Sequence, residues 1–210
     1  IEVLLGLGLA LAVNSVSRGR AILTTILALP VMISGGALGM TFRMLFTPQW
    51  GPVDNAVTRI FGVGSIDWLG NAALARMAVV LADVWQNTPF VMLICLAALA
   101  AIPEQIREAS SVDGATSMQR FRFIEFPLIA KFLLVATLFR LIDLFRIFDV
   151  VFVMTGGGPA SATETISYYI YRQGIRAFDV GYAVVLGVVL ALVMLVVCIG
   201  LIRLVGRRGQ

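Results

Sequence analysis

The sequence contains no histidine, and charged residues occupy only 13% of its 210 positions. The absence of histidine removes the commonest general base and metal ligand. The two cysteines, Cys95 and Cys198, both lie in apolar runs, so they do not indicate a disulfide framework. The sequence also lacks a Walker-type phosphate loop. These absences predict a chain with no catalytic site, metal or cofactor of its own.

Hydrophobic residues, by contrast, make up 60% of the chain. A soluble domain usually has about 45–50% apolar and about 25% charged residues. So few charges could not cover so much apolar surface in water, which predicts that the chain lies in a lipid bilayer. The formal net charge of +4 comes without a basic run, and membrane proteins carry excess arginine on cytoplasmic loops, so we expect no nucleic-acid partner.

Apolar runs divide the chain into predicted membrane helices. A helix needs about 20 apolar residues to cross the hydrocarbon core. Five runs reach or approach that length, at 1–14, 21–46, 72–101, 128–155 and 180–205. The chain begins at Ile1 inside the first and shortest run, so we expect at least part of one helix to precede it. The prediction is an all-α, multi-pass membrane protein with a single transmembrane domain over residues 1–210.

The distribution of basic residues predicts the orientation in the membrane. They cluster in three regions that strict alternation of the helices places on one side, and that side should be cytoplasmic. The residues are Arg18, Arg20, Arg107, Arg120, Arg122, Lys131, Arg203, Arg207 and Arg208. The connectors at 47–71 and 156–179 then face outward. Their aromatic residues are typical of membrane interfaces, and 164–178 is predicted to form a surface helix. These aromatics are Trp50, Trp68, Tyr168, Tyr169 and Tyr171.

The cytoplasmic connector at 102–127 has the most specific pattern in the chain. Pro103 can begin a short polar helix, because the first turn does not need its missing N–H. Gly114 can end that helix in a left-handed turn. A second helical segment then leads to Pro127, and Phe121 and Ile124 would let this segment lie on the membrane face. We therefore expect two short helices separated by a glycine.

This connector resembles the signature loop of the inner-membrane permeases of binding-protein-dependent ABC importers. In that signature Glu-Ala-Ala precedes a glycine, and Ile-x-Leu-Pro follows it. The matching residues are Glu108, Ala109, Gly114, Ile124 and Pro127. The sequence departs from the signature in the mild replacements Ser110 and Phe126.

The resemblance implies the permease core of a type I ABC importer. It also implies that the loop is a coupling helix that docks on a cytoplasmic ATPase. Glu108, Ala109, Asp113 and Gly114 would contact that ATPase, and Pro127 belongs to the same coupling motif.

Three further stretches are similar to the carbohydrate-uptake group of these permeases, which includes maltose, trehalose and glycerol-3-phosphate types. They are Trp85–Phe90, Arg140–Asp149 and Thr155–Pro159. More closely, they resemble the subunit type that pairs with a second, different permease. The resemblance covers nearly the whole chain, and it implies that an N-terminal helix of the six-helix core lies outside this sequence.

The same resemblance implies the partners and the location of the protein. The partners would be a second permease, two ATPase subunits that bind ATP and magnesium, and an extracytoplasmic solute-binding protein. The location would be the plasma (inner) membrane of a bacterium or archaeon.

Run four carries four charges inside the membrane, Arg140, Asp143, Arg146 and Asp149. Their alternating signs at a spacing of three residues would let helical neighbours meet. A lone charge at the bilayer centre costs at least about 2.5–3.5 kcal/mol, and an opposite charge lowers that cost. Two interpretations stay open: Arg140, Asp143 and Arg146 line the solute pathway, or the charges form a salt-bridge ladder between helices. The family resemblance favours the pathway, because in maltose-type permeases this helix contacts sugar.

Run three adds Asp83 and Asn87, which lie one helical turn apart and precede Pro89. A proline inside a helix removes one backbone hydrogen bond and bends the helix. A bend beside two polar groups suits a surface that faces a solute pathway. The alternative is helix packing through polar contacts.

The outer segment contains the glycine-rich stretch Gly156, Gly157, Gly158 and Pro159. It lacks the pattern of a nucleotide-binding loop and lies on the outer side. We expect a flexible loop that touches the binding protein or the mouth of the pathway. A plain turn that ends run four is the alternative.

The predicted function is half of a translocation pathway for a mono- or oligosaccharide, with alternating access driven through the coupling helix. Phe139, Phe145 and Phe148 could provide faces for sugar rings. Arg140 and Arg146 could suggest an anionic solute such as glycerol phosphate, but each has an aspartate neighbour that balances its charge. The alternative solute is glycerol 3-phosphate or another polyol. An ion-coupled secondary transporter that uses the charged residues as a relay is a further alternative. It leaves the cytoplasmic motif unexplained.

Overall fold

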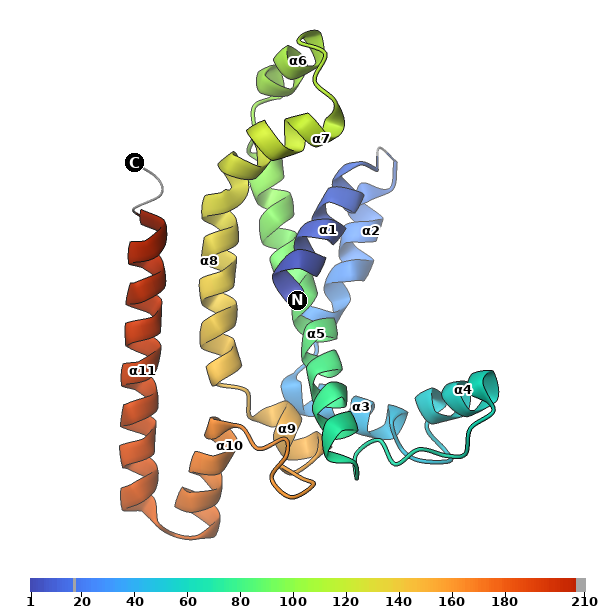
Figure 1. Cartoon of the computed structure of the whole chain (residues 1–210), viewed down its shortest axis with the longest axis vertical. Coiled ribbons are helices and arrows are strands. Elements are labelled where there is room, and N and C mark those ends of the chain that lie inside the picture. Colours follow the sequence, from blue (N-terminus) through green and yellow to red (C-terminus); the bar gives the residue numbers. More distant parts are fainter. Residues whose placement is uncertain (17, 207–210) are drawn as a thin grey trace. The chain divides into compact units, whose positions relative to one another are not determined.

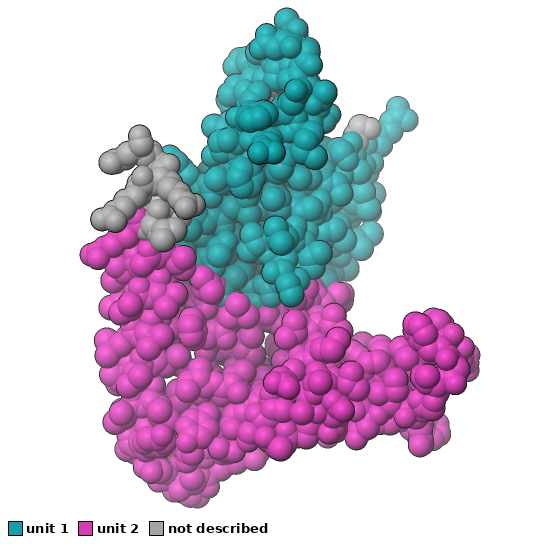
Figure 2. Space-filling view, in the orientation of Figure 1, with its two compact units in different colours: residues 1–32, 87–140 teal, residues 33–86, 141–210 magenta. Residues whose placement is uncertain are grey.

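The computed structural model describes residues 1–16 and 18–206, except the side chains of residues 107 and 204–206. The described residues form helices joined by loops, without a strand (Figure 1). This confirms the all-α prediction. Arg207 and Arg208, two of the predicted cytoplasmic charges, lie outside the described residues. The chain divides into two compact units, drawn in teal and magenta in Figure 2.

Unit 1 consists of residues 1–32 and 87–140. It holds α1 (Glu2–Asn14), α2 (Arg20–Ala28) and the 3-10 turn η1 (Leu29–Met32). It also holds the second half of α5 (Ala72–Ala100), α6 (Glu104–Val112), α7 (Ser117–Arg120), the π-turn η2 (Phe121–Glu125) and most of α8 (Phe126–Phe145). Its core joins α1, α5 and α8 through Ala10, Val13, Val91, Met92, Cys95, Leu99, Ile129, Leu133 and Ala136.

A small-residue face on α1 permits close packing within this core. Gly6 and Ala10 lie four residues apart and both are buried. A Cβ atom added to Gly6 would lie 2.7 Å from Cβ of Val91 on α5, closer than real Cβ atoms approach. Small residues at this spacing let membrane helices approach each other closely.

Unit 2 consists of residues 33–86 and 141–210. It holds α3 (Gly35–Leu45), α4 (Pro52–Phe61), the first half of α5 and α9 (Asp149–Met154). After these follow α10 (Ile166–Tyr171), the π-turn η3 (Arg172–Arg176) and α11 (Val180–Gly206). Helices α3 and α9 pack closely, since a Cβ on Gly39 would lie 3.0 Å from Cβ of Val153. Leu38, Phe46, Ala78, Ala82, Val150 and Met154 form the core of this unit.

Two of the predicted spans are interrupted, which corrects the prediction of single helices over 21–46 and 128–155. The first contains α2, η1 and α3, and Ser34 caps α3 by accepting a hydrogen bond from the N–H of Ala37. The second ends as a helix at Phe145 and resumes at Asp149. By length and composition, Ala72–Ala100 and Val180–Arg203 can each cross a membrane. The segments 20–32 and 35–45 make a third span if they are counted together.

Hydroxyl groups explain why the helix can end after Phe145. Ser167 Oγ donates to the carbonyl of Phe145 at 2.8 Å, and Thr165 Oγ1 donates to the carbonyl of Ile147 at 2.7 Å. The last carbonyls of a helix have no partner within it, so Ser167 replaces one missing bond at the helix end, and Thr165 binds the linker that follows. Thr165 also begins α10 by accepting from the N–H of Tyr168. The outer segment therefore fixes the break in the preceding span.

Candidate functional site

The connector at 102–127 folds into a short helix that ends at a glycine. Pro103 occupies the N-cap position of α6, and Gly114 follows the helix with a φ of +73°. The N–H of Ala115 donates to the carbonyl of Ser110 at 3.0 Å, which closes the end of the helix. A left-handed backbone disfavours residues with a Cβ, so the turn itself favours glycine at this position. The left-handed turn predicted at Gly114 is confirmed.

A second helical segment follows directly. Thr116 and Gln119 form a reciprocal capping box at the start of α7. The chain then passes through η2, where Glu125 is buried and lies 3.5 Å from Nε of Arg120. Pro127 sits in the first turn of α8. The segment is thus held at its start by a cap and further along by an ion pair.

The predicted coupling residues lie mostly on one exposed helix end. Glu108, Ala109, Asp113 and Gly114 are exposed on α6 or at its C-terminal end, whereas Ser110 is only 4% exposed. Pro127 is also exposed but belongs to α8, separate from this helix end. Val112, which sequence reasoning did not single out, is 88% exposed beside them.

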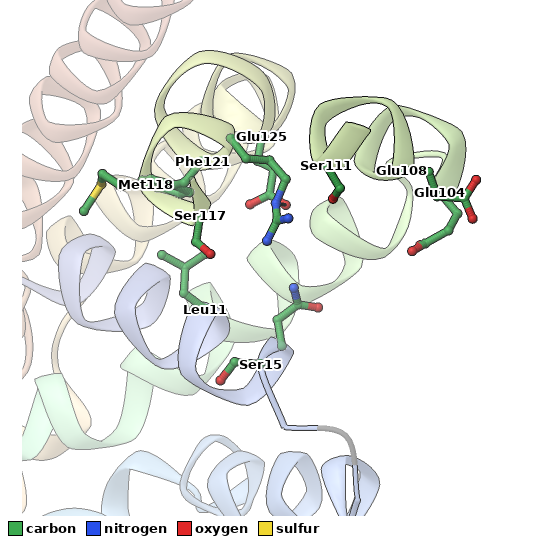
Figure 3. Close-up of a pocket in the computed structure, with 11 residues that line it drawn as sticks. Leu11, Ser15, Glu104, Glu108, Ser111, Ser117, Met118, Phe121 and Glu125 are labelled. Carbon is green, nitrogen blue, oxygen red and sulfur yellow. Dashed lines mark ion pairs between the residues drawn. The ribbon is translucent and has the colours of Figure 1, made fainter. Parts of the chain in front are cut away.

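A pocket of about 940 Å³ lies beside this helix, within unit 1 (Figure 3). The end of α1 contributes Leu11, Asn14 and Ser15 to its lining. The two cytoplasmic helices and the following turn contribute Glu104, Glu108, Ser111, Ser117, Met118, Arg120, Phe121 and Glu125. The pocket therefore lies between α6, α7 with the following turn, and the C-terminal end of α1.

The second candidate site is a buried ion pair between α1 and α8. Arg140 is 4% exposed, and both Nε and Nη2 donate to the carboxylate of Glu2, the latter at 3.0 Å. Such two-point contacts fix geometry as well as charge. Sequence reasoning missed Glu2, although a single carboxylate in an otherwise apolar run was a signal that it needed a cation.

Asn87 of α5 lies at a similar depth in unit 1. With a rise of about 1.5 Å per residue, Glu2 lies about 18 Å along α1 from Asn14. By the same measure, Arg140 lies about 21 Å from the start of α8 and Asn87 about 20 Å from the end of α5. The three polar residues therefore each lie about 18–21 Å along a helix from one of its ends.

The predicted four-charge helix is wrong, because α8 ends before it includes all four residues. Arg140 and Asp143 lie on α8, Arg146 follows its end, and Asp149 begins α9. Asp149 instead faces α3, where a Cβ on Gly35 would lie 3.0 Å from the aspartate Cβ. A carboxylate at a helix N-terminus is electrostatically favourable. Asp83, on α5, is buried and engaged in an interaction.

The glycine-rich outer loop is closed by its own hydrogen bonds. Thr163 Oγ1 donates to the carbonyl of Gly158 at 2.7 Å and lies 2.7 Å from Oγ1 of Thr155. Gly156 and Gly157 have φ values of +60° and +81°, and a Cβ on Gly157 would lie 2.7 Å from the ring of Tyr168. The glycines thus serve a tight turn against an aromatic ring. These bonds do not support the flexibility expected of Gly156–Pro159.

Asp54 organises the other outer segment and was not predicted as a site. It is 1% exposed and accepts hydrogen bonds from the N–H groups of Gln49 and Ile66 and from the side chains of Ser65 and Trp68, over 2.7–3.0 Å. These donors, led by Ile66 and Ser65, lower the pKa of Asp54 to about 2. Trp68 is therefore bound to a carboxylate rather than standing freely at the membrane interface.

A family model described as "Binding-protein-dependent transport system inner membrane component" matches residues 3–208. The chain belongs to this family. It is accordingly a multi-pass protein of the inner membrane, as predicted from the apolar runs and the signature loop.

Three relatives within this family have names that state the solute of their transport system. The trehalose/maltose transport system permease protein MalF of Thermococcus litoralis is 37% identical over 185 residues, which are 88% of this chain and 62% of that protein. The sulfoquinovosyl glycerol transport system permease protein SmoG of Agrobacterium fabrum is 33% identical over 89% of this chain and 60% of its own length. The sn-glycerol-3-phosphate transport system permease protein UgpA of Yersinia pestis is 34% identical over 99% and 70%.

A solved structure has a similar fold. A chain of a bacterial ABC transporter involved in the import of the acidic polysaccharide alginate superposes with a TM-score of 0.85 at 28% identity, over 97% of this chain and 72% of that chain. The inner-membrane component described here spans about three fifths of the length of the first curated relatives. The comparisons confirm the predicted family and its resemblance to sugar importer permeases.

Proposed function

We propose that this chain is the permease part of an ATP-driven importer for a saccharide. The observation that carries the proposal is the exposed helix α6, which presents Glu108, Ala109 and Asp113 and ends at the left-handed Gly114 within a family of importer permeases. A rigid helix between two membrane helices can transmit closure of an ATPase to the pathway. The chain itself would perform no chemistry.

The partners follow from the same proposal. A second, different permease would complete the pathway, two ATPase subunits would bind ATP and magnesium, and an extracytoplasmic binding protein would deliver the solute. The family description supports the binding protein, and the relatives named for trehalose/maltose and sulfoquinovosyl glycerol support a saccharide class. The relatives named for glycerol 3-phosphate support the alternative solute.

The proposed solute pathway includes Arg140 and Asn87, with Asp143, Arg146 and Asp83 as further candidates. Arg140 is bound to Glu2, so its charge is balanced inside the protein. This favours a polar, neutral solute over attraction of an anion by a lone arginine. Gly156, Gly157, Gly158 and Pro159 are proposed to contact the binding protein through a preformed turn.

Glu108→Lys tests the coupling role in the reconstituted importer. We expect uptake to fall at least about tenfold while the complex still assembles, because a charge reversal of a close, desolvated contact costs several kcal/mol. Glu104→Lys, with the same charge change in the first turn of α6, is the matched control. Normal uptake in Glu108→Lys would contradict the coupling role. ATPase stimulation across a panel of neutral sugars, anionic sugars and glycerol 3-phosphate would identify the solute class.

A further inference from the structure

A groove separate from the proposed solute pathway and the coupling helix runs between α2 and α5 within unit 1. It has a volume of about 740 Å³. The wall on α2 and η1 consists of Arg20, Ala21, Thr24, Thr25, Ala28, Leu29 and Met32, and the wall on α5 consists of Leu93, Leu96 and Ala97. All but three of these residues are apolar, so the groove suits a hydrocarbon chain.

The two threonines do not make the groove polar. Thr24 Oγ1 donates to the carbonyl of Arg20 at 2.8 Å, and Thr25 Oγ1 donates to the carbonyl of Ala21 at 2.9 Å. Both hydroxyl protons are therefore used within α2. Arg20 is the remaining strong hydrogen-bond donor of the lining.

Arg20 stands at one end of the groove, at the first residue of α2. No carboxylate among the described residues pairs with it. The orientation predicted from the arginines places this end on the cytoplasmic side. Arginines at that surface attract anionic lipid headgroups by about 1 kcal/mol each.

The length of the groove matches one leaflet of a bilayer. Arg20 and Met32 are twelve residues apart, which corresponds to about 18 Å along a helix. Half of a hydrocarbon core of about 30 Å is about 15 Å. With Arg20 at the headgroup level, Met32 therefore lies near the middle of the bilayer.

We propose that this groove binds an anionic phospholipid of the cytoplasmic leaflet. The phosphate contacts Arg20, and one acyl chain lies between α2 and α5 along Ala28, Leu93 and Leu96. The proposal rests on the membrane location and orientation and is independent of the solute.

Native mass spectrometry of the whole importer, purified from membranes of phosphatidylglycerol and phosphatidylcholine, tests the headgroup contact. We expect Arg20→Gln to retain roughly fivefold less phosphatidylglycerol, as the loss of one surface arginine predicts. Arg18→Gln makes the same charge change two residues away, outside the lining, and should retain the lipid. Equal retention in wild type and Arg20→Gln, or equal loss in both variants, would overturn the proposal.

Photocrosslinking identifies the occupant directly. A benzophenone side chain placed at Ala28 in the assembled importer should form adducts enriched in phosphatidylglycerol. The same side chain at Ile22, which is 66% exposed and outside the lining, should follow the bulk lipid composition. Adducts between position 28 and the second permease would overturn the proposal, because they would show a protein helix in the groove.

Discussion

The pair between Glu2 and Arg140 shows how one unpredicted side chain changes the interpretation of another. Arg140 was predicted as a pathway residue or as a member of a salt-bridge ladder between helices. Its bidentate partner is a carboxylate on another helix, 138 residues away in the sequence, and this partner was not among the predicted charges. Replacing either partner breaks a two-point contact between buried charges, and breaking a buried ion pair typically costs about 3–5 kcal/mol.

We therefore expect Glu2→Gln and Arg140→Gln each to lower the thermal stability of the importer strongly. The exchanged double variant, Glu2→Arg with Arg140→Glu, should recover much of that stability because it restores opposite charges. A measurement of solute uptake distinguishes between the two possible roles of Arg140, solute contact and the joining of helices. If Arg140 contacts the solute, the exchanged variant assembles but transports poorly; if the pair only joins helices, uptake returns with stability.

Asp54 predicts a pH dependence in the outer segment at 47–71. Its pKa is lowered from 3.8 to about 2, so the ionised form stabilises the folded segment above about pH 4 and this contribution is lost as the pH falls toward 2. Trp68 donates to Asp54 and reports on the segment. In a variant with Trp50→Phe and Trp85→Phe, its fluorescence should stay constant from neutral pH to about pH 4 and shift to the red below it.

Asp54→Asn provides the control for that titration. The amide removes the carboxylate that accepts four hydrogen bonds, so we expect the red shift already at neutral pH and no further titration. An unchanged spectrum in Asp54→Asn would show that the network does not hold Trp68.

At the scale of elements, the packing of α1 on α5 offers a matched pair of glycines. Gly6→Ala would place a Cβ against Val91, and overpacking of this kind typically costs about 1–3 kcal/mol. Gly8→Ala, on the same helix, meets no atom within 4 Å. We expect Gly6→Ala to lower the unfolding temperature and Gly8→Ala to leave it unchanged or raise it. Equal effects of the two changes would contradict close packing at Gly6.

At the scale of the whole molecule, the proposed coupling role of α6 predicts where the energy for transport comes from. Vesicles that contain the importer and internal ATP should keep uptake when an uncoupler removes the proton gradient. They should lose uptake when ATP is omitted. The opposite pattern would favour an ion-coupled transporter, in which the charged residues of α8 act as a relay.

The sequence alone determined the membrane class and the signature loop, because both depend on local composition and spacing. A 60% hydrophobic chain requires a bilayer wherever its helices pack, and Gly114 adopts a left-handed turn through its own lack of a Cβ. The match of Glu108, Ala109 and Pro127 to the signature likewise needs no tertiary contact. These features could be predicted because neighbours in sequence decide them.

Only the tertiary structure decided the breaks in the spans and the partners of the buried charges. Where the helix ends, Ser167 supplies a hydrogen bond to the carbonyl of Phe145 and Thr165 one to the carbonyl of Ile147 in the linker, from some twenty residues later in the chain. Glu2 pairs with Arg140, and Asp54 accepts hydrogen bonds from four donors. Hydrophobic periodicity does not encode either set of contacts. A run of apolar residues specifies that a segment enters the membrane, whereas the positions of distant polar side chains decide where it breaks and which charges it can bury.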